Sequence, residues 1–173
     1  MPTDDLLRRY LGAYPEHLQA QVRGLVEQGR LAEHLARRYP GSHQVQSDGA
    51  LHEYVQELKQ SYLRSAPPLH KVQFQNKMDV LQNVLGLHTA ISRVQGAKLK
   101  AKAEIRVSGL FKELAPEFLE MVVVHELAHL RERDHNKAFY QLCRHMLPDY
   151  HQVEFDLRLV LLQRALPSSS VGP

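Results

Sequence analysis

The chain has 173 residues, of which 43% are hydrophobic and 24% are charged. This length suits one compact domain with a real core and is too short for two full-sized domains, and the composition excludes a chain that is disordered throughout. The single cysteine, Cys143, excludes an internal disulfide and a cysteine-rich zinc cluster. No secretory signal or membrane-spanning segment is recognisable, so we expect a cytoplasmic protein without a membrane partner.

The net charge of +3 is unevenly distributed along the chain. Residues 71–115 carry eight Lys and Arg against three Asp and Glu, an excess of five positive charges, whereas residues 1–70 are balanced and residues 116–173 are slightly acidic. One interpretation is a solvated strand edge. The other is a surface that attracts acidic substrates or nucleic acid.

The first part of the chain has the apolar spacing of helices. Within residues 3–40, Pro15 suits the first turn of a second helix, and Gly29 interrupts the pattern before it resumes. Residues 50–64 predict a further amphipathic helix. We therefore expect an N-terminal helical region over residues 1–70.

The pattern then changes to that of strands. Val72 and Phe74 alternate with glutamines, residues 88–94 are rich in β-branched side chains, and residues 99–107 place apolar side chains at odd positions only. A period of two is typical of half-buried strands. The sequence predicts three strands in a small antiparallel sheet, with the last two joined as a hairpin.

From Pro116 the helical period returns. Residues 118–128 are almost entirely apolar, which predicts a helix that is buried on all sides. Asn136 is a suitable N-cap for the next helix, in which we interpret Cys143 as a small buried hydrophobe. A last helix is expected over residues 150–164.

The buried helix contains the run His125-Glu-Leu-Ala-His129. Histidines at positions i and i+4 share one helix face, so both rings can reach one zinc ion. Glu126 lies next to His125 around the helix and can reach metal-bound water without binding the metal. Two satisfied core histidines are the alternative, but polar groups within an apolar run need partners, and a metal is one.

A catalytic zinc usually has a third protein ligand, and His135 is the best candidate because it follows where the helix should end. Metzincins share this spacing, although Glu132 replaces their glycine here. Glu154 is the rival third ligand, and His145 is less well placed. The sequence thus predicts one zinc ion per chain, held by His125, His129 and His135.

The run from His125 to Tyr140, followed by Pro148-Asp-Tyr150, resembles the YgjP-like metallopeptidase family, which is related to SprT-like proteins. Members of this family show a His-Glu-Leu-x-His-Leu stretch, an Asn-His-Ser segment, a Phe-Trp pair and a Pro-Asp-Tyr. Here Asp134, Asn136 and Tyr140 replace the family's Asn, Ser and Trp.

The resemblance covers about residues 85–165 and implies an α+β, zincin-like fold, with the small sheet packed on the active-site helix. We then expect an N-terminal helical region (residues 1–70), a metallopeptidase domain (residues 71–166) and a disordered tail (residues 167–173). Residues 1–70 have no recognisable counterpart in the family. The family's Arg-Trp-Gly-Ser-Cys stretch is absent, because the chain has no Trp.

We therefore predict a zinc-dependent hydrolase, a metallopeptidase in which zinc activates water and Glu126 acts as general base. Five further residues could stabilise the transition state or orient a ligand: Tyr150, His151, Arg133, Asp134 and Asp149.

A peptide or protein substrate could add as a strand to the sheet edge near residues 99–107. The basic side chains of Lys100, Lys102 and Arg106 would favour acidic partners there. Two alternatives stay open. One is a zinc-binding interaction module without turnover. The other is a nucleic-acid-associated protein, including a protease of DNA-bound proteins.

Overall fold

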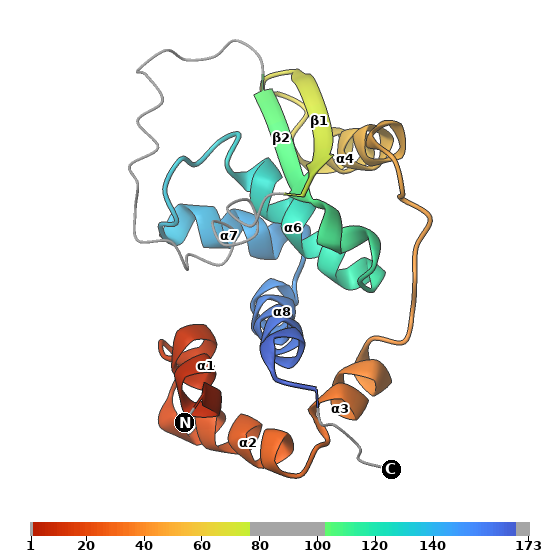
Figure 1. Cartoon of the computed structure of the whole chain (residues 1–173). Coiled ribbons are helices and arrows are strands. Elements are labelled where there is room, and N and C mark those ends of the chain that lie inside the picture. The colour runs from red at the N-terminus through yellow and green to blue at the C-terminus, as the bar shows by residue number, and fades with distance from the viewer. Residues whose placement is uncertain (1, 77–102, 169–173) are drawn as a thin grey trace. The chain divides into compact units, whose positions relative to one another are not determined.

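The computed structural model describes residues 2–76 and 103–168 (Figure 1). The chain divides into two compact units, one formed by residues 1–40 and 154–173 and the other by residues 41–153. Within the described residues, none of the helices combines the length and apolar character that a membrane crossing requires.

The first unit consists of helices. They are α1 (Pro2–Leu11), α2 (Glu16–Glu27), α3 (Leu31–Arg38) and the larger part of α8 (Tyr150–Ala165). Gly29 ends α2 with a φ of 67°, a conformation that glycine adopts without strain. The N–H groups of Gly29 and Arg30 donate to carbonyls in the last turn of α2. The helix therefore ends where Gly29 was predicted to interrupt the helical pattern.

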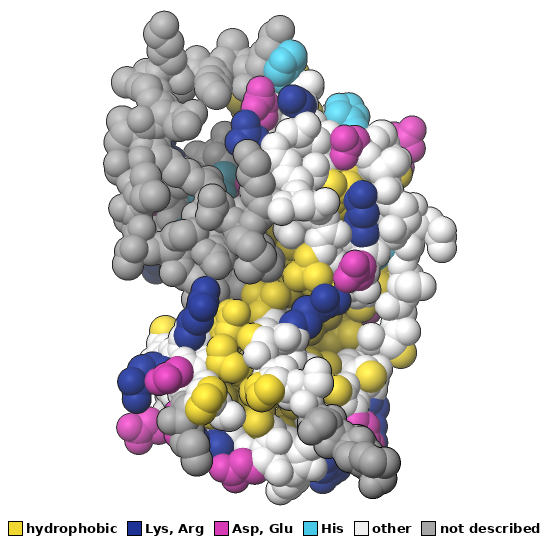
Figure 2. Space-filling model, viewed as in Figure 1, with side chains coloured by type: hydrophobic (Ala, Val, Ile, Leu, Met, Phe, Trp, Pro, Cys, Tyr) yellow, Lys and Arg dark blue, Asp and Glu magenta, His cyan; other side chains and the backbone are white. Residues whose placement is uncertain are grey.

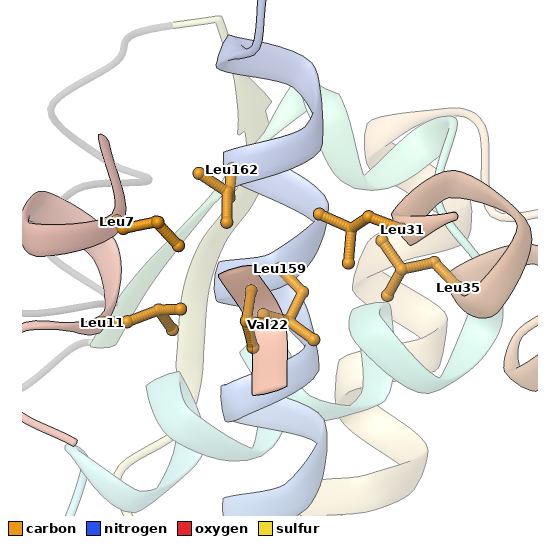
Figure 3. Packing of buried hydrophobic residues seen from close by; sticks show 7 residues of the cluster. All are labelled: Leu7, Leu11, Val22, Leu31, Leu35, Leu159 and Leu162. Atoms are coloured by element: carbon orange, nitrogen blue, oxygen red, sulfur yellow. The ribbon is translucent and has the colours of Figure 1, made fainter. Parts of the chain in front are cut away.

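All four helices contribute to the core of this unit (Figure 3). Its buried apolar residues are Leu7, Leu11, Val22, Leu31, Leu35, Leu159 and Leu162. Asp156 is also buried, and it accepts a hydrogen bond from the hydroxyl of Tyr39 and lies 3.4 Å from the guanidinium of Arg38. A buried carboxylate needs such partners, because burial without them is strongly unfavourable.

The second unit contains the predicted site. Its elements are α4 (Asp48–Tyr62), β1 (Leu69–Gln75), β2 (Ala103–Ser108), the 3-10 helix η1 (Gly109–Lys112), α6 (Pro116–Ala128), α7 (Lys137–Met146) and the first turn of α8. Helix α4 packs on β1, and α6 contacts both β2 and α4 (Figure 1). The chain is therefore an α+β protein, as the sequence predicted.

The sheet differs from the prediction. Its two described strands are parallel, with Val72 opposite Ile105 and Phe74 opposite Val107, so the antiparallel arrangement is wrong for this pair. The predicted strand over residues 88–94 lies outside the described residues. Alternation correctly identified Ile105 and Val107 as buried, but alternation is the same for either strand direction. Residues 76–102 connect the strands, which is long enough for the crossover that parallel strands need.

Helix α6 is buried on nearly every side, as predicted. Nine of its side chains are buried, among them that of His125, while the side chain of Glu126 is partly exposed. Burial raises the pKa of Glu120 on the same helix, and the neighbouring Glu117 carboxylate raises it further. Glu120 therefore lies in partly desolvated surroundings, where charges interact more strongly than in bulk water.

Candidate metal centre

The structure brings the rings of three histidines together at the end of α6. The Nε2 atom of His129 lies 3.2 Å from that of His125 and 2.9 Å from that of His135. The ligand atoms of the three side chains all lie within 4.8 Å of one another. His125 is buried, His129 is partly buried and His135 is exposed, so the centre runs from the core to the surface.

The local fold explains this convergence. His125 and His129 are one turn apart, and the N–H of His129 still donates to the carbonyl of His125 at 3.3 Å. The helix then ends in tight turns, in which the N–H groups of Arg131 and Glu132 both donate to the carbonyl of Ala128. The chain thereby reverses, and His135 returns to the two helical histidines.

The geometry fits a metal ion. Four-coordinate zinc binds imidazole nitrogens at about 2.0–2.1 Å, which separates the nitrogens by about 3.3 Å. The observed separations of 3.2 and 2.9 Å are close to this value. A cation between these nitrogens would be attracted by the lone pair of each ring, whereas lone pairs that face one another directly repel.

Hydrogen bonds at Nδ1 hold two of the rings, and one of these bonds selects the tautomer that a metal requires. The Nδ1 atom of His129 lies 3.0 Å from the backbone carbonyl oxygen of Glu132. A carbonyl can only accept, so Nδ1 carries the hydrogen and Nε2 presents its lone pair to the centre. The Nδ1 atom of His125 lies 2.8 Å from the buried hydroxyl of Tyr150. Partners of this kind fix the orientation of metal-binding histidines.

Phe139 forms an apolar wall beside the three rings. Its ring centroid lies 5.1 Å from that of His125, 4.6 Å from that of His129 and 4.9 Å from that of His135. The side chain of Asn136 accepts a hydrogen bond of 2.9 Å from the N–H of Phe139, which caps α7 as predicted. The cap and the burial of Phe139 hold this wall in place.

The other residues predicted for the site lie in varied positions. Arg133, Asp134, Asp149 and His151 are exposed. The hydroxyl of Tyr150 contacts the Nδ1 atom of His125, and a backbone carbonyl contacts that of His129. The suggestion that Asp134 or Asp149 orients a ligand histidine stays a prediction.

The predicted substrate-edge residues are only partly described. Lys100 and Lys102 lie outside the described residues. Arg106 is exposed on β2, where its guanidinium lies 3.5 Å from the carboxylate of Glu104. Glu154, the rival third ligand, does not belong to the three-histidine group.

Sequence reasoning missed two contributors to the site. The backbone carbonyl of Glu132 leaves no side-chain signal in a sequence. The position of Phe139 could have been predicted from the sequence. An N-cap at Asn136 places residue 139 in the first turn of α7, directly after the loop that carries His135.

Replacing Tyr150 by Phe is expected to lower the affinity for zinc by about 10- to 100-fold, because the buried Nδ1 of His125 loses its partner. Competition with a chromophoric chelator measures this. Tyr54→Phe, which removes the hydroxyl of a partly buried tyrosine on α4, is the matched control. Equal zinc affinity in the Tyr150→Phe and wild-type proteins would contradict the orienting role.

Comparison with known proteins assigns the family. The model of the YgjP-like metallopeptidase domain matches residues 14–159, which extends well before the residues that carried the resemblance and includes most of residues 1–70. UTP pyrophosphatase from Escherichia coli (strain K12) is 58% identical over 162 residues, which is 94% of this chain and 97% of that protein. No solved structure matches. This protein therefore belongs to the YgjP-like metallopeptidase family.

Proposed function

We propose that this protein is a zinc-dependent hydrolase that cleaves UTP to UMP and pyrophosphate. The observation that carries this proposal is the 58% identity, over nearly the whole of both chains, to a protein named UTP pyrophosphatase. The convergence of His125, His129 and His135 supports the metal dependence.

The site contains the groups that such a reaction needs. Three imidazole nitrogens suit zinc, which when bound would act as a Lewis acid and lower the pKa of water toward about 7. Glu126 follows His125 directly on α6 and is partly exposed, as a group that exchanges protons with a substrate site must be. Phe139 excludes water from one side of the centre.

The proposed reaction is a hydrolysis at the α-phosphorus. Glu126 accepts a proton from the attacking water, whose oxygen forms a bond to the α-phosphorus. The bond from that phosphorus to the bridging oxygen breaks, and pyrophosphate leaves with the electron pair. Glu126 then returns the proton to solvent.

A triphosphate is an acidic substrate, which agrees with one of the two interpretations of the basic excess in residues 71–115. On the face shown in Figure 2, the visible Lys and Arg side chains lie among Asp and Glu side chains. Binding of nucleic acid stays a prediction, which a salt-dependent gel shift would test.

Peptide hydrolysis is the second candidate. The matching family model is described as a metallopeptidase domain, and the His-Glu-x-x-His arrangement on α6 suits attack on a carbonyl as well as on a phosphorus. The same three histidines and the same general base would serve either substrate. Groups around the centre must therefore decide between them.

The decisive experiment offers both substrates to the zinc-loaded protein. With UTP and magnesium we expect equal amounts of UMP and pyrophosphate on ion-exchange chromatography, loss of both products with a chelator, and recovery on adding zinc. Release of UDP and phosphate would show that the bond assignment is wrong. Cleavage of an unstructured peptide pool with UTP untouched would establish the peptidase, and turnover of neither would favour a zinc-binding interaction module.

A further inference from the structure

We infer that Tyr140 and His151 form a stacking platform for the nucleobase of a uridine nucleotide, beside the three-histidine centre. This inference rests on the proposed function and adds the place where the base binds.

The platform is defined by ring contacts within the second unit. The ring centroids of Tyr140 and His151 lie 5.2 Å apart, with the ring planes inclined by 40°. The Tyr140 ring also lies 6.3 Å from the ring of His135, with the ring planes inclined by 45°. Tyr140 therefore connects a predicted metal ligand to a further aromatic ring that plays no part in holding the metal.

The platform residues are at least partly exposed and lie near buried aromatic rings. His135 and His151 are exposed and Tyr140 is partly exposed. The ring of Tyr140 lies 5.1 Å from that of Phe139 and 6.3 Å from that of Tyr150, which are both fully buried. A binding surface whose rings are fixed by buried neighbours loses little conformational entropy when a ligand arrives.

The backbone holds the two platform residues at the ends of two helices. Tyr140 lies in the first turn of α7, where its N–H donates to the carbonyl of Asn136 at 3.2 Å. His151 follows Tyr150, whose hydroxyl contacts His125. The platform and the metal centre therefore share their supports, so their relative position is fixed within this unit.

This arrangement matches the chemistry of a nucleotide. Bases stack on aromatic side chains whatever their hydrogen-bonding pattern, because every base has a π face. Only the sugar separates the base from the α-phosphorus, so a base on Tyr140 would leave the reacting phosphorus close to His135. Inorganic triphosphate has no base, so it could not stack on a partly exposed aromatic surface beside the three-histidine centre.

The test compares ligands with and without a base. Dissociation constants of UMP and of ribose 5-phosphate are measured by NMR titration of the zinc-free protein, and KM and kcat for UTP are measured on the zinc-loaded protein. Tyr140→Ala is expected to weaken UMP binding by about tenfold or more and to raise KM for UTP similarly, with ribose 5-phosphate binding and kcat retained. His151→Ala should give a smaller effect of the same kind.

Two further variants separate stacking from structural support. Tyr140→Phe keeps the ring and should bind UMP within about twofold of the wild type. Tyr62→Ala removes a tyrosine that is 40% exposed and whose ring lies 5.7 Å from that of His145, a residue outside the three-histidine group. This variant should change neither the dissociation constant of UMP nor the KM for UTP. Zinc content is measured in every variant, because loss of zinc from Tyr140→Ala would show that Tyr140 only supports His135.

The outcomes distinguish this inference from the proposed function. If the wild type cleaves UTP and Tyr140→Ala has the same KM, the platform is wrong and the function stands. Equal weakening of UMP and ribose 5-phosphate would also overturn the platform. If the wild type binds UMP through Tyr140 but does not cleave UTP, the platform stands and the proposed reaction is wrong.

Discussion

The Glu126→Gln protein is expected to keep its zinc and to lose about 10²- to 10⁴-fold of its hydrolytic rate, because the amide cannot accept a proton from the attacking water. The two side chains have nearly the same shape, so the packing of α6 should not change. The measurement is kcat for UTP, with zinc content determined on the same sample. If the protein also cleaves a peptide, Glu126→Gln should lower the rate of that cleavage by a similar factor.

Glu120→Gln is the matched control for this variant. Glu120 lies on the same helix and is also partly buried, but it is six residues before Glu126. The control should retain nearly full activity, which would show that removing a carboxylate from α6 is tolerated. A Glu126→Gln protein as active as the control would remove Glu126 from its role as general base and leave the metal assignment intact.

The second large effect is expected from the histidines. The wild-type protein should hold about one zinc ion, and both His125→Ala and His135→Ala should lose most of it after dialysis, because two imidazoles bind zinc much more weakly than three. Elemental analysis measures the zinc content. Thermal unfolding with and without chelator is a second measurement of zinc binding. A metal that binds the folded state raises the melting temperature, so the chelator should lower it for the wild-type protein.

His125→Ala and His135→Ala differ in their expected effect on the stability of the fold. His125 is buried, so its removal can also destabilise the core, whereas His135 is exposed and gives the cleaner result. His145→Ala removes an exposed histidine of α7 that is outside the three-histidine group and should keep one zinc ion. Full zinc retention in both ligand variants would refute the assignment of the three histidines as zinc ligands. Zinc retention in His135→Ala alone would show that the third ligand is another residue.

The metal centre by itself does not decide which bond is cleaved. A metal that activates water can serve attack on a carbonyl or on a phosphorus, because both transition states place negative charge on oxygen. The family description and the name of the relative point to different substrates. The surroundings of the centre are therefore the informative part of the molecule, and the platform formed by Tyr140 and His151 is the feature there that favours a nucleotide.

The sequence by itself determined the local features. The helical spacing of apolar residues predicted the helices, and the uninterrupted apolar run after Pro116 predicted that α6 is buried. Asn136 predicted the cap of α7. The four-residue spacing of His125 and His129 was enough to place both rings on one helix face. These predictions succeeded because the period of a helix and its capping depend on residues within one or two turns.

Only the tertiary structure decided features that join distant parts of the chain. The parallel direction of β1 and β2 depends on how the intervening residues run, because the alternation of buried side chains is the same in either direction. The hydroxyl of Tyr150 reaches His125 across 25 residues of sequence. The carbonyl of Glu132 orients His129 through the shape of a turn, which the identity of a side chain does not encode. The sequence named the histidines, and the packing of the chain determined the groups that orient and surround them.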